Sequence, residues 1–156
     1  MKRRLRSALP SDARRLWRWA NDPESRRASF TPGRIPWPDH LKWFGEKLAS
    51  DTVRIYLGVG PGSRPVGQVR FEVDRPGRAV VSIVVAPAAR RKGIAKVLLA
   101  EGIPRAARDL GLRTIHAYVK EDNLPSLALF RASGFRLVRR LMCAGAPSVL
   151  LSRPAR

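Results

Sequence analysis

The sequence predicts one domain of mixed α/β (α+β) architecture, with a mostly antiparallel sheet and about four flanking helices. At 156 residues the chain has the length of a single domain that can bury its own core. Segments with apolar residues at helical spacing alternate with segments of period two. Short turns such as DRPG separate three consecutive strand-like segments and favour antiparallel pairing between neighbours.

The N-terminal third predicts one strand and two helices. The strand covers RRLRSAL, residues 3–9, and Ser11 followed by Asp12 is expected to cap the first helix, which carries Leu16 and two tryptophans. Residues 31–39 hold three prolines and a glycine and therefore predict a loop. Asp39 is expected to cap the second helix, where apolar residues recur at helical spacing.

The remainder alternates strands with two further helices. Strands are predicted over residues 53–59, 66–73, 78–85, 114–119 and 135–142, and near 148–153. One helix covers 93–110, where Pro104 predicts a kink or a break near Gly102 and Ile103. The other covers 124–133 and ends at Gly134. The element order is β, α, α, β, β, β, α, β, α, β, β.

Charge is the compositional anomaly of this chain. It has 31 Lys and Arg against 12 Asp and Glu, a formal net charge of +19. The cationic residues are spread in pairs along the whole sequence, which is typical of a solvated surface. Such a field still attracts polyanions, and a small molecule with phosphates would benefit as much as a nucleic acid.

Other chemistries find little support in the composition. The single cysteine, Cys143, permits no internal disulfide, and it lacks ligand spacing to either histidine, so no metal site is expected. The N-terminal residues contain no apolar stretch long enough for a signal peptide, and no apolar run suits a membrane span. A cytoplasmic protein without a membrane partner is therefore predicted.

A cationic glycine turn joins the strand at 78–85 to the following helix. The first amides of a helix have no partner within the helix, and together with the helix dipole they favour a phosphate. Gly93 permits close approach of a ligand and torsions that other residues disfavour. Arg90, Arg91 and Lys92 add positive charge at the same place. An ordinary turn with solvated charges is the alternative reading of this segment alone.

Two motifs about 30 residues apart resemble the GNAT superfamily of N-acyltransferases. VVAPAARRKGIAKVLL resembles the acyl-CoA-binding pattern V-x-P followed by R/Q-x-x-G-x-G/A, with Ala95 at the last position. AYVKEDNLPSLALFRASGF resembles the next block of the same family. The resemblance implies a single domain over residues 1–156, with a central pair of splayed strands, that uses acetyl-CoA as co-substrate.

The resemblance also implies roles for individual residues. Val84 and Val85 would lie at a bulge where backbone groups pair with the pantetheine arm, and an amide there, assigned to Val84, would polarise the thioester carbonyl. Asn123 would hold the cofactor and Ser126 would lie near its phosphates; a helix N-cap and an exposed hydroxyl are the alternatives. The loop that cradles the pyrophosphate comprises Arg90, Arg91, Lys92, Gly93, Ile94 and Ala95.

The proton-transfer groups are less well defined. Many relatives have a tyrosine where this chain has Phe130, which cannot donate a proton and is expected to shape the thioester site or to pack in the core. His116 and Tyr118 alternate onto one face of their strand, and we assign Tyr118 to the catalytic set. Glu72 is the carboxylate candidate for deprotonating the amine. Ser82 is a weaker option.

The N-terminal segment resembles relatives that acetylate sugar-linked amines, with Trp17 or Trp19, Asn21, Asp22, Pro23 and Arg26 followed by His40, Trp43 and Phe44. Arg26, Arg27 and Arg34 are expected either to meet nucleotide phosphates or to form a solvated rim. The acceptor is thus predicted to be an amine-bearing small molecule, with a nucleotide-linked amino sugar first. The N-terminus of a ribosomal protein or another small amine is the alternative acceptor. A homodimer would be in keeping with the family.

A second class of function stays open at this point. The high net charge and Phe130 would also suit a nucleic-acid-binding protein on an inactive version of the same fold. That hypothesis predicts steeply salt-dependent binding. It leaves the glycine turn and the Asn123 block without a role, so nucleic acid is not the expected partner.

Overall fold

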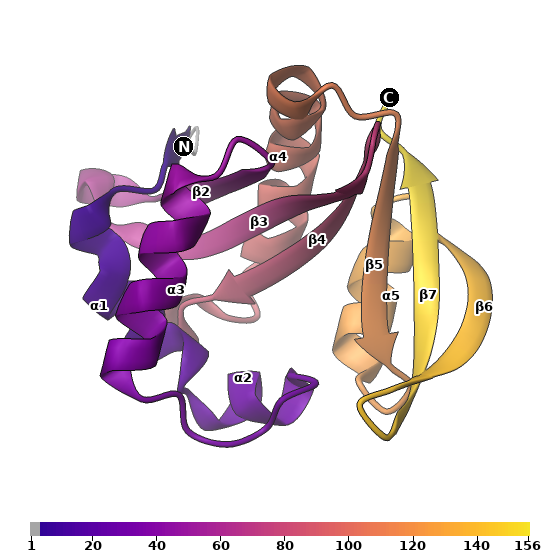
Figure 1. The fold of residues 1–156 in the computed structure, drawn as a ribbon, viewed down its shortest axis with the longest axis horizontal. Coiled ribbons are helices and arrows are strands. Elements are labelled where there is room, and N and C mark those ends of the chain that lie inside the picture. The colour runs from indigo at the N-terminus through magenta and orange to yellow at the C-terminus, as the bar shows by residue number, and fades with distance from the viewer. Residues whose placement is uncertain (1–3) are drawn as a thin grey trace.

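The computed structural model describes residues 4–156 and has the predicted mixed α/β fold with a largely antiparallel sheet (Figure 1). The strands are β1 (Arg4–Ser7), β2 (Val53–Val59), β3 (Pro65–Arg75), β4 (Arg78–Val85), β5 (Thr114–Lys120), β6 (Arg136–Cys143) and β7 (Ala146–Pro154). The helices are α1 (Ala13–Ala20), α2 (Pro23–Ala28), α3 (Trp37–Ala49), α4 (Ile94–Leu110) and α5 (Leu124–Ala132). Arg3, at the start of the predicted first strand, lies outside the described residues.

The seven strands form one sheet in the order β1-β2-β3-β4-β5-β7-β6. Every neighbouring pair is antiparallel except β4 and β5, which run parallel. The helix α4 provides the crossover between these two strands, as a parallel connection requires. Short turns join β2 to β3 and β3 to β4, so the predicted antiparallel hairpins are confirmed.

Helices cover both faces of the sheet (Figure 1). One core lies between the sheet and α4 with α5, and it includes Phe71, Leu99 and Phe130. A second core lies under α1 and α3 and includes Leu16 and Phe44. Alternation along each strand therefore decides which side chains reach the α1 and α3 face, where Arg70, Glu72, Ser82 and Tyr118 lie.

The α4 helix lies very close to the sheet because glycines occupy the contact on both sides, Gly67 in β3 and Gly102 in α4. A Cβ at Gly67 would lie 2.8 Å from Leu98 Cδ1, and one at Gly102 would lie 2.9 Å from Val69 Cγ1. Of the kink or break predicted near Gly102 and Ile103, the break is wrong, since α4 continues through Pro104 to Leu110. Proline removes one helical hydrogen bond at a cost of about 3 kcal/mol, and burial of the flanking Ile103 and Ala106 offsets this loss.

The predicted helix caps and helix number need correction. Asp12 is the N-cap residue of α1, as predicted, but its side chain makes no cap bond there; its carboxylate instead accepts the Leu9 amide at 2.8 Å across the preceding 3-10 turn. Asp39 lies inside α3, which begins at Trp37 after Pro36. The fifth helix, α2, was not predicted, because its six residues have no apolar period; the Asp22-Pro23-Glu24 start signal was present in the sequence.

Candidate acyl-transfer site

The strands β4 and β5 diverge in the middle of the sheet (Figure 1), and the hollow between them, lined in part by Val80, Ser82 and Tyr118, is called the cleft. Their registered pairs run only from Arg78 with Thr114 to Val80 with His116. Beyond these pairs β4 continues to Val85 and β5 to Lys120, so each presents an edge without a neighbouring strand among the described residues. The predicted splayed pair is therefore confirmed.

The open edge of β4 is regular, and the bulge expected near Val84 and Val85 is absent there. The ladder with β3 keeps a constant register from Ala79 to Val85, and the Ala86 amide donates to the Val66 carbonyl at 2.9 Å. Because amides alternate in an antiparallel ladder, the Val84 amide is directed toward β3. The amides of Ile83 and Val85 are directed toward the cleft, which corrects the residue assigned to the thioester carbonyl.

The glycine turn lies at the N-terminal end of α4, beside this edge. Gly93 has a φ of 74° and Arg91 a φ of 61°, so two left-handed residues fold the chain tightly just before Ile94. Within residues 4–156, the amides of Arg91, Lys92 and Gly93 donate no hydrogen bond to protein. The side chains of Arg91 and Lys92 are exposed. Free amides and exposed cations at a helix start are the donor set that an anion requires.

Arg90 differs from its two cationic neighbours. Its guanidinium lies 2.7 Å from the Asp22 carboxylate and 2.7 Å from that of Glu24, and it donates to Ser25 Oγ at 3.2 Å. Burial alone would raise the pKa of Asp22, but the hydrogen bond and charge of Arg90, together with the backbone amides of Ser25 and Glu24, outweigh it and lower that pKa. Arg90 is thus tied to the start of α2.

The second motif lies at the other side of the cleft. Asn123 is the N-cap of α5, and its side chain accepts the Ser126 amide at 3.3 Å. Phe130 is buried and packs edge-to-face on Phe135 with ring centroids 5.0 Å apart. The alternatives stated from the sequence, a helix N-cap for Asn123 and core packing for Phe130, are therefore confirmed. Ser126 is half-buried in the first turn of the same helix.

A cavity of about 380 Å³ lies where the strands separate, on the α1 and α3 face. Its lining residues are Phe30, Val80, Val81, Ser82, Tyr118 and Cys143. Tyr118 and Ser82 were candidates from the sequence. Phe30 and Cys143 were not, since they come from distant segments and only the fold brings them to the cleft. His116 lies one alternation below Tyr118, and its Nδ1 is buried without a hydrogen-bond partner among residues 4–156. Burial, with the nearby Arg78 charge, lowers the pKa of His116 and keeps the ring neutral near pH 7.

Glu72 is held by two cations. It accepts a hydrogen bond from Lys47 Nζ, and Arg70 Nε donates to its other oxygen at 2.8 Å. Burial raises its pKa, but Lys47 and Arg70 outweigh burial and lower it below the ordinary value. Arg70 in turn donates to Ser82 Oγ at 3.3 Å and lies over Trp43. A carboxylate stabilised as an anion in this way is a poor proton acceptor at neutral pH.

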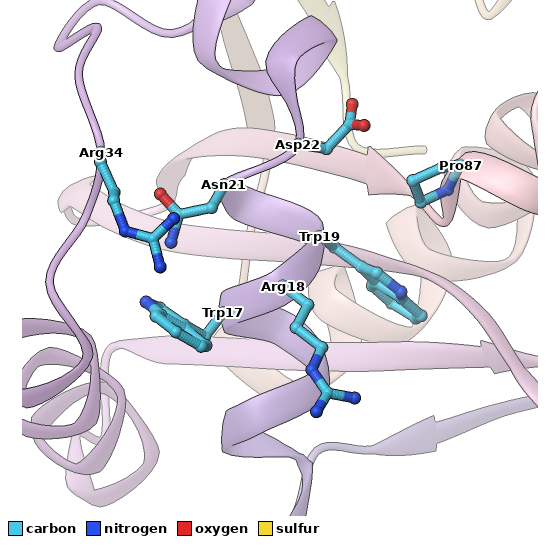
Figure 2. Close-up of a pocket in the computed structure, with 7 residues that line it drawn as sticks. All are labelled: Trp17, Arg18, Trp19, Asn21, Asp22, Arg34 and Pro87. Carbon is cyan, nitrogen blue, oxygen red and sulfur yellow. The ribbon is translucent and has the colours of Figure 1, made fainter.

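The N-terminal signature residues build a second pocket (Figure 2), and most of them fix the chain. Figure 2 shows Trp17 and Arg34 on one side of this pocket and Trp19 with Pro87 on the other. Trp17 Nε1 donates to the Ile35 carbonyl at 2.8 Å, and Asn21 bonds both the amide and the carbonyl of Ile35. These bonds hold the proline-rich loop against α1.

The arginines of this region have different environments. The guanidinium of Arg26 donates to the carbonyls of Ala20, Thr31 and Gly33, so its donors are engaged by backbone. Arg27 and Arg34 are exposed, and Arg34 lies 5.4 Å from the centre of the Trp17 ring. His40 is buried and contacts the Ala13 carbonyl at 3.0 Å through Nε2.

Comparison with known proteins identifies the family of the chain. The diverging parallel pair β4 and β5, beside a glycine turn at the start of α4, agrees with the acyltransferase-type domain that the resemblance implies. Residues 13–135 match the family described as Acetyltransferase (GNAT) family. The chain belongs to this family, and the resemblance noted from its two motifs is confirmed.

Individual relatives cover different shares of the chain. It is 33% identical over 102 residues to the putative phosphinothricin acetyltransferase YwnH of Bacillus subtilis, which covers 62% of this chain and 61% of that protein. It is 26% identical over 122 residues to acetyltransferase PseH of Campylobacter jejuni, covering 78% of this chain and 75% of that protein. The chain thus spans less than two thirds of the length of YwnH.

Solved structures share the whole fold. The phosphinothricin acetyltransferase of Sinorhizobium meliloti in complex with AcCoA superposes with a TM-score of 0.84 at 24% identity, over 99% of this chain and 89% of that one. The spermidine N-acetyltransferase of Vibrio cholerae, solved with CoA and spermine, gives 0.88 at 17% identity over 98% and 95% of the two chains. Both likenesses confirm the fold.

Two negative findings concern the described part of the chain. Within residues 4–156, no group of three or more His, Cys, Asp or Glu side chains could hold a metal ion. In the same residues no helix is long and apolar enough to cross a membrane.

Proposed function

We propose that the protein is an acyl-CoA N-acetyltransferase that moves the acetyl group of acetyl-CoA to a primary amine. The observation that carries this proposal is the open β4 edge beside the glycine turn at the start of α4. Free amides from Arg91 to Ala95 and the side chains of Arg91 and Lys92 suit a pyrophosphate. The β4 edge offers alternating amides and carbonyls that suit the amide groups of a pantetheine arm.

Direct transfer within a ternary complex is the mechanism that we propose for the groups around the cavity. The thioester supplies an activated acetyl carbonyl, and the amine attacks its carbon as the bond to sulfur breaks. The cleft-facing amide of Ile83 or Val85 stabilises negative charge on the carbonyl oxygen. Tyr118 is assigned to protonate the departing thiolate. The neutral ring of His116, or a water beside it, accepts the proton that the amine loses, while Glu72 holds Lys47 and Arg70 in place.

An anionic acceptor suits this protein better than a polycationic one. The net charge of +19 attracts a nucleotide-linked amino sugar and repels a polyamine. The likeness to PseH supports a sugar-linked amine as the first acceptor to test. The likeness to YwnH supports a small amine such as phosphinothricin as the alternative, and a protein N-terminus is the third.

Initial-rate measurements test both parts of the proposal. Release of the CoA thiol from acetyl-CoA is followed with a UDP-linked amino sugar, phosphinothricin, spermidine and an N-terminal peptide. We expect turnover with the amino sugar, the weakest turnover with spermidine, and intersecting double-reciprocal lines. Parallel lines would indicate an acyl-enzyme and contradict direct attack. Cys143→Ala is the matched control, because this lone cavity thiol must be dispensable for direct attack.

A further inference from the structure

Four contacts hold α2 and its N-cap across the open end of the cleft. At the β4 side, Arg90 binds Asp22, Glu24 and Ser25. At the β5 side, Lys120 Nζ donates to the Arg27 carbonyl at 2.9 Å. Figure 1 shows α2 on the side where the two strands diverge. The segment is therefore anchored to β5 and to the turn that follows β4.

The anchored segment ends at a residue that lines the cavity. Phe30 follows α2 and lies against the same space as Val80, Ser82 and Tyr118. Residues 22–30 thus connect the glycine turn directly to the wall of the candidate acceptor cavity. Any displacement of α2 at Arg90 would move Phe30 relative to Tyr118.

Charge balance separates Arg90 from its neighbours. Arg90 faces the carboxylates of Asp22 and Glu24 at 2.7 Å each, so the three side chains together have a net charge of −1. Its side chain is 20% exposed, whereas Arg91 and Lys92 are exposed and form no ion pair within residues 4–156. A phosphate would have to displace two charge-assisted hydrogen bonds to reach Arg90, but none to reach Arg91.

We propose that Arg90 is a positioning residue that couples the cofactor-binding turn to the acceptor wall formed by α2 and Phe30, and that Arg91 and Lys92 provide the phosphate-binding side chains. This inference rests on the proposed acetyl-CoA-dependent function. It replaces the expectation that all three cations meet the pyrophosphate. Arginine suits the role because its planar fork engages two carboxylates at once, which a lysine cannot do equally well.

The test compares Arg90→Gln with Arg91→Gln, which remove one charge each from adjacent positions. Calorimetry with acetyl-CoA measures cofactor affinity, and hydrogen exchange followed by mass spectrometry measures opening of residues 22–31. For Arg90→Gln we expect less than threefold change in Kd and at least tenfold faster exchange in this segment. For Arg91→Gln we expect about tenfold weaker binding and unchanged exchange in this segment.

Coupling has its own readout, which a merely structural contact would leave unchanged. In the wild type, acetyl-CoA is expected to slow exchange in both 86–96 and 22–31. In Arg90→Gln it should slow exchange in 86–96 only, and Arg90→Lys should recover part of the effect in 22–31. With the best amine acceptor, Arg90→Gln should raise the acceptor KM more than it lowers kcat.

The outcomes separate the two proposals. Equal loss of acetyl-CoA affinity in both variants, with unchanged exchange in 22–31, would overturn the role of Arg90. A double variant, Asp22→Asn with Glu24→Gln, should reproduce the faster exchange while every cation of the turn is retained. If the wild type binds no acetyl-CoA, the proposed function fails, and the ligand-free exchange rates still decide whether Arg90 holds α2.

Discussion

At the scale of single residues, the two tyrosines of the chain lie in contrasting environments. Tyr118 lines the cavity beside Ser82, on the face where an acceptor would bind. Tyr56 is fully buried on the opposite face, and its hydroxyl donates to Asp109 at 2.7 Å. Burial, with Asp109, raises the pKa of Tyr56 and keeps it neutral. Of the two tyrosines, Tyr118 is therefore the one to which the proposed proton transfer is assigned.

Tyr118→Phe tests that assignment. Loss of a general acid typically lowers kcat by about 10²-fold or more, and binding of acetyl-CoA should be unchanged because the ring is retained. Steady-state rates and calorimetry measure the two quantities. Tyr56→Phe is the control and should keep kcat while losing about 1 kcal/mol of stability with its hydrogen bond. Unchanged kcat in Tyr118→Phe would assign the proton to another donor.

Asp12 is expected to make the free energy of unfolding depend on pH in the acid range. Its buried carboxylate accepts two hydrogen bonds from Arg6 at 2.8 Å and one from the Leu9 amide. Burial raises the pKa of Asp12, but these bonds outweigh burial and lower it. Because the pKa is lower in the folded state, the associated stability is complete above the unfolded pKa, and it is lost as pH falls through the folded value.

We therefore expect the free energy of unfolding to fall below about pH 4. Asp12→Asn should lower stability by about 1–3 kcal/mol at pH 7 and flatten the acid part of the curve. Urea unfolding at several pH values gives both results. An unaltered acid slope in the variant would show that Asp12 does not carry this dependence.

The sequence could predict residues whose role is local, and it could not predict those whose partner is distant. Gly93 was identifiable because a left-handed residue before a helix favours glycine, and the capping role of Asn123 was among the alternatives. Arg90 pairs with Asp22, 68 residues away, and Glu72 pairs with Lys47, 25 residues away, each in another element. No pattern along the chain indicates such pairs.

At the scale of elements, the α4 helix packs closely on the sheet because glycines, which have no side chain, lie at the contact. Gly67 lies under Leu98, and an added Cβ would also lie 2.9 Å from the Val84 carbonyl oxygen. That backbone contact cannot move without disturbing β4 at the open edge of the cleft. The glycine therefore sets both the helix–sheet distance and the course of the candidate site.

Gly67→Ala should destabilise the protein by about 1–3 kcal/mol, since overpacking forces neighbouring groups apart. Gly45→Ala is the matched control: Gly45 lies in α3 with no atom within 4 Å of an added Cβ. Alanine there should be neutral or stabilising by up to about 1 kcal/mol. Thermal unfolding followed by circular dichroism compares them, and equal effects would contradict the close approach of α4.

The sequence predicted the elements whose apolar period extends over many residues. It did not predict those whose conformation depends on contacts with distant segments. The seven strands and four longer helices follow from periods of two and 3.6 in the sequence. The α2 helix has too few residues to show a period, and it is held by Arg90 and Lys120. Pro104 remained helical because both of its neighbours in the core face are buried.

At the scale of the whole molecule, the net charge of +19 has two readings that salt can separate. A phosphate-bearing cofactor held by a built site should lose part of its affinity with added salt and remain bound. Nonspecific polyanion binding should disappear over the same range, because it depends on released counterions. Gly93 and Gly111 are matched positions for substitution in this test, because they lie at opposite ends of α4 with similar left-handed φ values of 74° and 66°.

The most direct measurement is calorimetric titration with acetyl-CoA at two salt concentrations, using the wild type, Gly93→Glu and Gly111→Glu. The two variants introduce the same charge at equally left-handed glycines, and only one lies in the glycine turn. We predict micromolar binding by the wild type and by Gly111→Glu, and loss of binding in Gly93→Glu. Absence of binding by the wild type, or equal binding by both variants, would contradict a cofactor site at the start of α4.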